Sequence, residues 1–559
     1  MRKHIIVTVL LLFVAAFITI FYFNNLNTAG MRRDKLMRLI PGNAALIFEF
    51  NNDAGFYDVF ENDSLFKAVA GKQRLSELTV LRDKLSLNPL LKKYFTAQNI
   101  FISIHPSKTD TADMLLTTST ANQLDLAVFD QLSKQTGNGL VVTPISERGK
   151  KGYDIYINEL KKRFYIISQG ENILSASFSK DLLDQSSLDK NKTDAPPFVL
   201  LSEQQNANSL ANLYVNYDAL SSLFDLIFAN KNTDILKSLR LLPGLATLSL
   251  NYRRDALMFN GSTNIRQDKP ESYLNLYTNE QASVNYLKDI LPSTTAYSIN
   301  FAVADPLKFG ADLSNWHIKA GLKNEKESVF NKIKAETGIN IKNDFNKLLG
   351  NEFVALTTRY FEKLAIIQVK DGSKARLLMA ALSKITEEPF STSTSGRKSN
   401  SSAGLLTADD KVDFFKENSG ELNYDKLPFF LLGDAFSIFK HPYYLVIDNY
   451  LILANSKNEL ESYYDSYINR KFLSKNEQYN AFNNLLAERS TVSFFFHFKN
   501  LLPILKRDLN PNIYNIFDGK DAGWGNFYGA SWQFTAAEKS FYTNFCMKLN
   551  SGATNNQNK

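Results

Sequence analysis

The chain has 559 residues, a formal net charge of +7, 44% hydrophobic residues and a single cysteine. This length exceeds the roughly 250–300 residues at which one core stops growing, so we expect more than one globular unit. The small net charge supports neither a nucleic-acid-binding stripe nor the steering of acidic substrates, and one cysteine excludes an intrachain disulfide.

The first predicted element is a hydrophobic segment over residues 5–23. As a helix it would span about 28 Å, close to the hydrocarbon thickness of a bilayer. Arg2 and Lys3 precede it as in a secretory signal, but the apolar run is longer than the roughly 7–15 residues of a cleaved signal. We therefore predict an uncleaved signal anchor within residues 1–30. A cleaved signal ending near residues 28–30 is the alternative.

A basic cluster follows the anchor, formed by Arg32, Arg33, Lys35 and Arg38. Under the positive-inside rule these charges count against a body outside the cytoplasm. The position of the segment at the very N-terminus, with its own basic flank, favours an outside body, and we predict that topology. The cluster itself is a solvated spacer or, alternatively, a contact for anionic lipid head groups.

The rest of the chain repeats itself. Residues 40–50, a turn followed by a strand pattern, recur as residues 291–301. Four further patterns recur in the same order: 124–134 as 374–384, 173–176 as 451–454, 213–217 as 494–498, and 249–252 as 531–534. This order predicts an internal duplication, with lobe one over residues 31–285 and lobe two over residues 286–559.

Lobe two carries an insertion with its own composition. Residues 391–402 are almost entirely serine, threonine and other polar residues. Such a segment cannot bury enough apolar surface to order itself. We predict a disordered Ser-rich insertion over about residues 389–425.

Strand patterns in both lobes indicate antiparallel sheets. Residues 46–51 and 297–302 alternate between two faces, which predicts a sheet with one face at least half exposed. The segments 153–158, 163–168 and 173–178 are joined by short polar links, which suit an antiparallel meander and are too short for parallel crossovers.

Helical periodicity lies between the strands. It covers residues 124–134, 220–241, 325–349, 374–385, 459–467 and 477–487. Ser456 and Glu459 have the spacing of a capping box. We predict the α+β class: two tandem similar lobes, each a mainly antiparallel sheet backed by helices, behind one N-terminal transmembrane helix.

Four stretches carry a family resemblance. Residues 348–358, then 364–371, then a helix from Lys374, together with the opening pattern at residues 40–50, resemble domain-of-unknown-function family 3352, a bacterial family of membrane-anchored proteins. The resemblance covers about residues 38–550. It implies a single-pass protein of the bacterial inner (cytoplasmic) membrane with its body in the periplasm or outside, and it transfers no catalytic residue.

Recognisable catalytic and metal-binding motifs are missing from the sequence. It contains no His-Glu-x-x-His, phosphate-binding loop, Gly-x-Ser-x-Gly or calcium-loop pattern. The five histidines, His4, His105, His317, His441 and His497, include no pair at ligand spacing. We therefore predict no metal, no cofactor and no catalytic residue.

Several weaker patterns have ordinary structural explanations. Ser64 and Lys67 have a Ser-x-x-Lys spacing, but Ser64 is better explained as a helix N-cap. Residues 523–529 are glycine-rich and precede a strand, so they are a turn and not a dinucleotide loop. Cys546 alternates with apolar neighbours in a strand and has no evident base.

Acidic residues are further candidates for acid–base groups. The pairs Glu387–Glu388 and Asp409–Asp410 flank the Ser-rich insertion and are interpreted as solvated charge. Glu49 lies on a predicted strand, but its counterpart in lobe two is Asn300. On this comparison no titratable constellation is shared by the two lobes.

Three functional hypotheses follow. The leading one is a non-catalytic, membrane-tethered envelope protein that binds or scaffolds a protein, lipid or polymer partner. The alternatives are a hydrolase with a site in the inter-lobe groove, and a carrier of lipid or another small molecule with a large apolar cavity. The partner and the oligomeric state are not determined by the sequence.

Overall fold

The computed structural model describes residues 29–53, 56–57, 65, 68–69, 71–107, 112–135, 139–170, 172–186, 209–242, 244–265, 272–383, 408–517 and 523–550. The predicted anchor at residues 5–23 lies outside them. None of the helices in this described part has the length and apolar character needed to cross a bilayer. By their internal contacts, residues 1–59 with 76–220 form one compact unit, and residues 60–75 with 221–559 form another.

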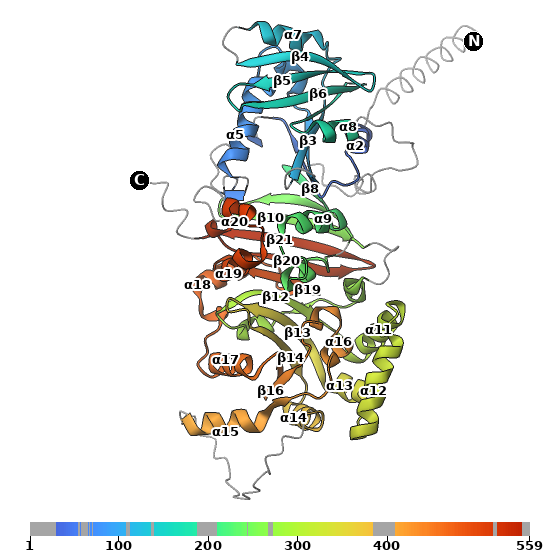
Figure 1. Cartoon of the computed structure of the whole chain (residues 1–559), viewed down its shortest axis with the longest axis vertical. Coiled ribbons are helices and arrows are strands. Elements are labelled where there is room, and N and C mark those ends of the chain that lie inside the picture. The colour runs from blue at the N-terminus through green and yellow to red at the C-terminus, as the bar shows by residue number, and fades with distance from the viewer. Residues whose placement is uncertain are drawn as a thin grey trace, which may run out of the picture. The chain divides into compact units, whose positions relative to one another are not determined.

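The first unit contains an antiparallel sheet (Figure 1). Its strands lie in the order β4-β5-β6-β7-β3-β2-β1-β8. They are β1 (Leu46–Asn51), β2 (Asn99–Pro106), β3 (Ala112–Ser119), β4 (Leu140–Glu147), β5 (Lys150–Ile157), β6 (Lys162–Gly170), β7 (Ile173–Ser177) and β8 (Ala211–Asn216). The segment β5-β6-β7 is the meander predicted from the sequence, so that prediction is confirmed.

Helices accompany the sheet of the first unit. They are α2 (Ala29–Arg38), α6 (Lys92–Phe95), α7 (Ala127–Lys134) and α8 (Lys180–Ser186). The helix α5 (Lys72–Leu81), which continues as a π-helical turn at Arg82–Ser86, belongs to this unit from Ser76 on. Phe129 and Leu132 of α7 pack with Tyr153 and Ile155 of β5 in one hydrophobic core. The amphipathic pattern of residues 124–134 therefore places a helix on the sheet as predicted.

The second unit contains a longer antiparallel sheet. Its strands lie in the order β9-β10-β21-β20-β19-β12-β13-β14-β17-β16-β15. They are β9 (Leu245–Tyr252), β10 (Ala256–Asn264), β12 (Thr295–Ala302), β13 (Leu349–Thr358), β14 (Lys363–Val369), β15 (Ser419–Glu421), β16 (Tyr443–Ile447), β17 (Tyr450–Ala454), β19 (Val492–His497), β20 (Phe527–Ala537) and β21 (Ser540–Leu549). A separate small pair joins β11 (Ser283–Val284) to β18 (Arg489–Ser490).

Helices lie on both faces of this second sheet. They are α10 (Asp234–Leu239), α11 (Pro306–Lys319), α12 (Lys323–Thr337), α13 (Ile341–Leu348), α14 (Gly372–Ala381), α15 (Ala408–Asn418), α16 (Leu427–Leu432), α17 (Lys457–Ile468), α18 (Glu477–Asn483), α19 (Phe498–Asp508) and α20 (Pro511–Phe517), while α9 (Tyr217–Ile227) belongs partly to each unit. Short 3-10 turns are η3 (Tyr273–Tyr277), η4 (Leu287–Ile290), η5 (Asp434–Phe436), η6 (Leu473–Lys475) and η7 (Trp524–Asn526). The molecule is therefore α+β with antiparallel sheets, as predicted.

The strand orders of the two units correspond. The order β8-β1-β2-β3-β7-β6-β5 in the first unit matches β19-β12-β13-β14-β17-β16-β15 in the second. In each case the strand patterns that recur in the sequence, such as β1 with β12, occupy matching positions. The helices that follow β8 and β19, α9 and α19, both have 11 residues.

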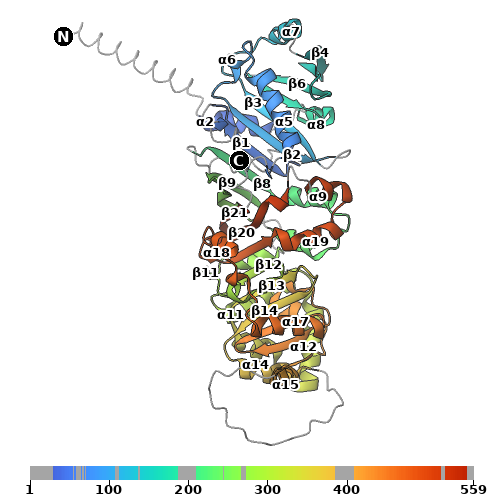
Figure 2. The same ribbon diagram turned by 90° about the vertical axis from the view of Figure 1, so that its left-hand side faces the viewer.

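The strands β10 and β21 pair with each other in a locally two-fold arrangement. Each is the second strand of a hairpin, β9–β10 or β20–β21, and the register places Asn260 opposite Asn544 at the centre. Near the ends of α9 and α19 (Figure 2), Ala229 N donates to Asp508 O at 2.9 Å and Asn510 N donates to Ile227 O at 3.0 Å. These two bonds are reciprocal, because each of the two corresponding segments donates one bond to the other and accepts one from it. The pairing of β10 with β21 is also why residues 245–264 group with the second unit, and the predicted lobe boundary at residues 285/286 stays a prediction.

The central strands of the second unit are buried on both faces. Every residue of β12 is buried, including Ser298 and Asn300. One face packs with residues of α17 and α18 such as Tyr463 and Phe482. On the other face, Phe301 contacts Tyr277 and Phe436. The prediction of a half-exposed face is therefore wrong for β12, because helices from distant parts of the chain cover both sides.

The C-terminal part of the predicted Ser-rich insertion contains a helix and a strand. Residues 384–407 lie outside the described part, but residues 408–425 include α15 and β15, where disorder was predicted. Phe414 and Phe415 of α15 both pack against Tyr464 of α17, with ring centroids 5.7 and 5.6 Å apart. These two aromatic side chains give this end of the insertion enough apolar surface to fold.

Candidate functional site

A buried carboxylate, Glu49, lies on β1 with 2% of its surface exposed. Its Oε1 accepts hydrogen bonds from Arg33 Nε at 2.6 Å and Asn99 Nδ2 at 3.0 Å. Its Oε2 accepts from the Tyr214 hydroxyl at 2.8 Å and from Asn212 Nδ2 at 3.4 Å. Four donors suit a group that only accepts. Because Arg33 lies on α2, this carboxylate holds the helix before β1 against the sheet.

The Tyr214 hydroxyl stays a donor in this arrangement. Burial of the ring, followed by the neighbouring Glu49 carboxylate, raises the pKa of Tyr214 well above its ordinary value. The phenol therefore keeps its proton and donates a hydrogen bond to Glu49.

A second buried carboxylate, Glu352, lies on β13 and is also 2% exposed. Its Oε2 accepts from the backbone N–H groups of Tyr286 at 3.0 Å and Leu287 at 3.1 Å, and its Oε1 accepts from Asn300 Nδ2 at 2.9 Å. Among the described residues no lysine or arginine lies at ion-pair distance from it. Burial raises the pKa of Glu352 to about 7, although the two backbone donors oppose this rise.

The two carboxylates form the same cross-strand pair with the residue types exchanged. On β1 and β2, Glu49 bonds to Asn99, which lies opposite Asn51. On β12 and β13, Asn300 bonds to Glu352, which lies opposite Ala302. One half thus has Glu on the first strand and Asn on the second, and the other half has the reverse.

This exchange was missed by the sequence comparison. A position-by-position comparison pairs Glu49 with Asn300 alone, and so it does not find the carboxylate of the second half. The signal that could have revealed it is the second half of the pair, Asn99 against Glu352, in the segment where the two copies align least well. The conclusion that the halves share no titratable constellation is therefore corrected.

A small cavity adjoins Asn300 and has a volume of about 30 Å³. Its polar walls come from three neighbouring strands: Ser298 and Asn300 of β12, Ser493 of β19, and Ser531 and Gln533 of β20. Lys288, Tyr479 and Glu488 line it as well. Since one water needs roughly 10–15 Å³ by this measure, the cavity has room for about one or two molecules of that size.

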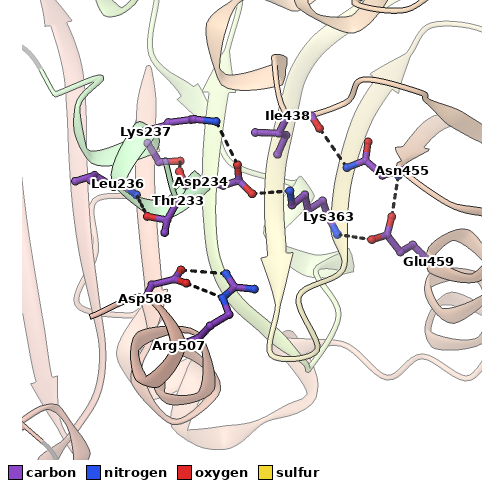
Figure 3. Close-up of polar contacts among 11 residues, drawn as sticks. Thr233, Asp234, Leu236, Lys237, Lys363, Ile438, Asn455, Glu459, Arg507 and Asp508 are labelled. Atoms are coloured by element: carbon purple, nitrogen blue, oxygen red, sulfur yellow. Dashed lines mark hydrogen bonds and ion pairs between the residues drawn. The ribbon is translucent and has the colours of Figure 1, made fainter. Parts of the chain in front are cut away.

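A charged cluster joins α10 to the second sheet (Figure 3). Thr233 caps α10 by accepting from Leu236 N at 3.4 Å, and Asp234, the first residue of this helix, pairs with Lys363 Nζ of β14 at 2.6 Å. The backbone N–H of Lys363 donates to Glu459 Oε1 at 3.3 Å. The chain of contacts connects α10, β14 and the start of α17.

The same close-up shows Arg507 and Asp508 at the end of α19 (Figure 3). Arg507 donates through Nε and Nη2 to both carboxylate oxygens of Asp508, at 2.6 and 3.0 Å. Its guanidinium carbon also lies 4.2 Å from the centre of the Phe361 ring. Asp508 is 3% exposed whereas the Arg507 side chain is 55% exposed, so the arginine shields a buried carboxylate at the surface.

The four described histidines do not share a contact partner in the contacts given below. His105 bonds through its ring nitrogens to Asn43 Oδ1 and Ser103 Oγ, each at 2.8 Å, and His441 lies 2.9 Å from Asp425. Burial lowers the pKa of both His317 and His497 to about 4, so these rings are neutral at physiological pH. His4 lies outside the described residues.

The other sequence candidates have structural positions. Residues 523–529 form a turn with η7 that leads into β20. Cys546 is buried on β21, and burial raises the pKa of its thiol to about 12. Residues Ser64, Lys67, Glu387 and Glu388 lie outside the described part, while Asp409 and Asp410 belong to α15. Within the described ranges no group of three or more His, Cys, Asp or Glu residues could hold a metal ion.

Comparisons with known proteins give little further information. No family profile matches the chain, and no curated protein sequence matches it. Two crystal structures of TP0453, forms III and I, are similar at 11% and 13% identity with TM-scores of 0.24 and 0.23. Each covers 44% of this chain, and the match spans 88% and 87% of TP0453. Similarity this low supports no conclusion on function, and the likeness to domain-of-unknown-function family 3352 stays a prediction.

Proposed function

We propose that the chain is a non-catalytic, membrane-tethered envelope protein built from two similar lobes, which binds or scaffolds a partner in the envelope. The observation that carries this proposal is the exchanged Glu–Asn pair. The buried carboxylate of each half is used to fix the segment before the first strand, through Arg33 in one half and through Tyr286 N and Leu287 N in the other. An ionisable group that recurs in both halves is thus committed to holding the fold together.

The duplication within this proposal is supported by several independent agreements. The strand order matches over β8-β1-β2-β3-β7-β6-β5 and its counterpart, and α9 and α19 have the same length. The reciprocal bonds at Ala229 and Asn510 lie 281 positions apart along the chain, the same spacing that separates α9 from α19. A copied gene explains all of these at once.

The membrane tether rests on residues 5–23, whose length and apolar character suit a bilayer-spanning helix. A reporter enzyme that is active only outside the cytoplasm, fused after Lys559, tests the topology. We expect an active reporter in intact bacterial cells. An inactive reporter, together with activity of a cytoplasmic reporter at the same position, would contradict an outside body.

Binding is tested by cross-linking in intact cells, followed by mass spectrometry. The full chain is compared with a chain in which residues 5–23 are replaced by a cleaved secretion signal. We expect the full chain to yield a reproducible partner, with lower yield when the tether is removed. Steady turnover of ester, peptide or glycoside substrates by the purified chain, abolished by replacing a single Ser, Asp or Glu, would contradict a non-catalytic role.

A further inference from the structure

Asn300 has an unused hydrogen-bond acceptor inside the second sheet. Its side chain is 5% exposed, and its Nδ2 donates to Glu352 Oε1 at 2.9 Å. Its buried Oδ1 has no hydrogen-bond partner within the described residues. Leaving a buried polar atom unsatisfied costs roughly 1–3 kcal/mol, so a donor is expected to meet it.

The cavity beside Asn300 is the place where such a donor could lie. Its volume of about 30 Å³ suits a molecule the size of water. Ser298 and Ser493 add hydroxyl oxygens on the two neighbouring strands. Gln533 also lines the cavity, but both ends of its amide are already bonded to the backbone of Ala487 at 2.9 and 2.7 Å.

The two halves of the molecule differ in how the buried carboxylate is balanced. Glu49 has the Arg33 guanidinium at 2.6 Å, whereas the described residues around Glu352 offer backbone and amide donors only. Burial raises the pKa of Glu352 and the charge of Lys288 opposes this rise, but among the described residues no lysine or arginine forms an ion pair with it. The second half therefore retains the acid without an ion-paired cation. A small cation in the adjoining cavity would restore the balance.

We propose that this cavity binds a small ammonium group, that of free ammonium or of a short primary amine, which donates a hydrogen bond to Asn300 Oδ1 beside Glu352. An ammonium group has only donors, which matches a wall of amide and hydroxyl oxygens. Its positive charge is attracted by Glu352, which is hydrogen-bonded to Asn300, and by Glu488, which lines the same cavity.

Other titratable groups also determine the net charge around the cavity. Lys288 lines the cavity and opposes a second cation. Tyr479 also lines it, and burial raises the pKa of that phenol far above neutrality, so it is uncharged. Burial and then the Glu352 carboxylate raise the pKa of Tyr450, which is likewise neutral. Glu352 is the group whose ionisation changes near pH 7.

The test measures unfolding of the full chain at pH 8 with four chloride salts at equal ionic strength: ammonium, methylammonium, sodium and tetramethylammonium. A ligand that binds only the native state multiplies the folded-to-unfolded ratio by 1 + [L]/Kd, about 11-fold at ten times Kd. We expect saturable stabilisation by ammonium and methylammonium only. The response should weaken at pH 6, where Glu352 takes up a proton.

Two variants locate the effect. Asn300→Leu should abolish the ammonium response relative to its own baseline, while Asn99→Leu, which removes the asparagine of the Glu–Asn pair in the first half, should keep it. If Asn300→Leu does not fold, Glu352→Gln retains the cavity and should weaken the response. Equal stabilisation by all four salts would show that the cavity holds water alone and overturn the proposal. An ammonium response that survives Asn300→Leu would overturn it as well.

Discussion

At the scale of single residues, the molecule buries two carboxylates at corresponding places and balances them differently. Glu49 is met by an arginine, and Glu352 by backbone N–H groups and an amide. A neutral amide donor compensates a buried charge less than a cation does, so we expect the two acids to respond differently to substitution.

Glu352 makes stability depend on pH. Its pKa is raised from 4.5 to about 7 in the folded chain. The folded state therefore binds the proton more tightly than the unfolded state, and the stabilisation is fully present below pH 4.5. It is lost as the pH rises from 4.5 to 7, by about 3 kcal/mol at most. Chemical unfolding across this range checks the sign. The slope should disappear in Glu352→Gln, and an unchanged slope would contradict the assignment.

The same substitution at the two positions should have opposite outcomes. Glu49→Gln leaves Arg33, whose side chain is 13% exposed, without its counter-charge, and should cost about 3 kcal/mol at pH 8. Glu352→Gln can still accept from Tyr286 N and Leu287 N, and the Asn300 amide can turn to meet the new NH₂ group. We expect it to be neutral or stabilising at pH 8. Equal losses in urea unfolding would contradict the difference between the two sites.

The limits of sequence reasoning are visible in this pair. Glu49 could be singled out because a carboxylate on an apolar strand is conspicuous in a single segment. Its partner Asn99 is 50 positions away, and the pairing depends on the register of β1 with β2. Since the residue types are exchanged between halves, position-by-position comparison hides the very feature that the halves share.

At the scale of elements, local signals were predictable and burial was not. The capping box at Ser456 is present as predicted: Ser456 Oγ accepts from Glu459 N, and Glu459 Oε2 accepts from Ser456 N. All of its atoms lie within one turn of chain. By contrast, β12 is covered by elements from other parts of the chain, such as η3 and α19, which no alternating pattern within the strand can reveal.

The cap offers a direct test of how much a helix start contributes. Ser456→Ala removes the acceptor for Glu459 N at 3.3 Å and should lower the free energy of unfolding by about 1 kcal/mol. Asn458→Ala, two residues further on and exposed, is the matched control and should change it by less than about 0.5 kcal/mol. Thermal or urea unfolding measures both. A larger loss in the control would place the contribution elsewhere in the helix.

At the scale of the whole molecule, the pairing of β10 with β21 joins segments from the first and last halves of the chain. At its centre Asn260 Nδ2 donates to Asn544 Oδ1 at 2.6 Å, and Phe259 lies 6.4 Å from Phe545 between ring centroids. The recurrence of the strand pattern at residues 249–252 and 531–534 was visible in the sequence. That the two hairpins would pair with each other was not, because local patterns carry no information on which strand edges meet.

The central asparagine pair can be tested by a double-mutant cycle. Asn260→Ala and Asn544→Ala should each lower stability by about 1 kcal/mol, and the double variant should lose less than the sum by roughly 0.5–1 kcal/mol, because both remove the same hydrogen bond. Combining Asn260→Ala with the distant Ser456→Ala should be additive. Additivity in the asparagine pair would mean that the bond contributes nothing in solution.

The joint between β10 and β21 has a consequence for how the protein behaves at high concentration. Each strand is the open side of its own hairpin, with a row of backbone groups that could recruit any other extended chain. In a two-fold contact, each member uses the same edge to bind the other. Both edges are occupied once two members have paired, so the contact cannot propagate into a fibre. Because β10 and β21 belong to one polypeptide, their two strand edges pair with each other. Neither of these two edges is then available as a template for aggregation.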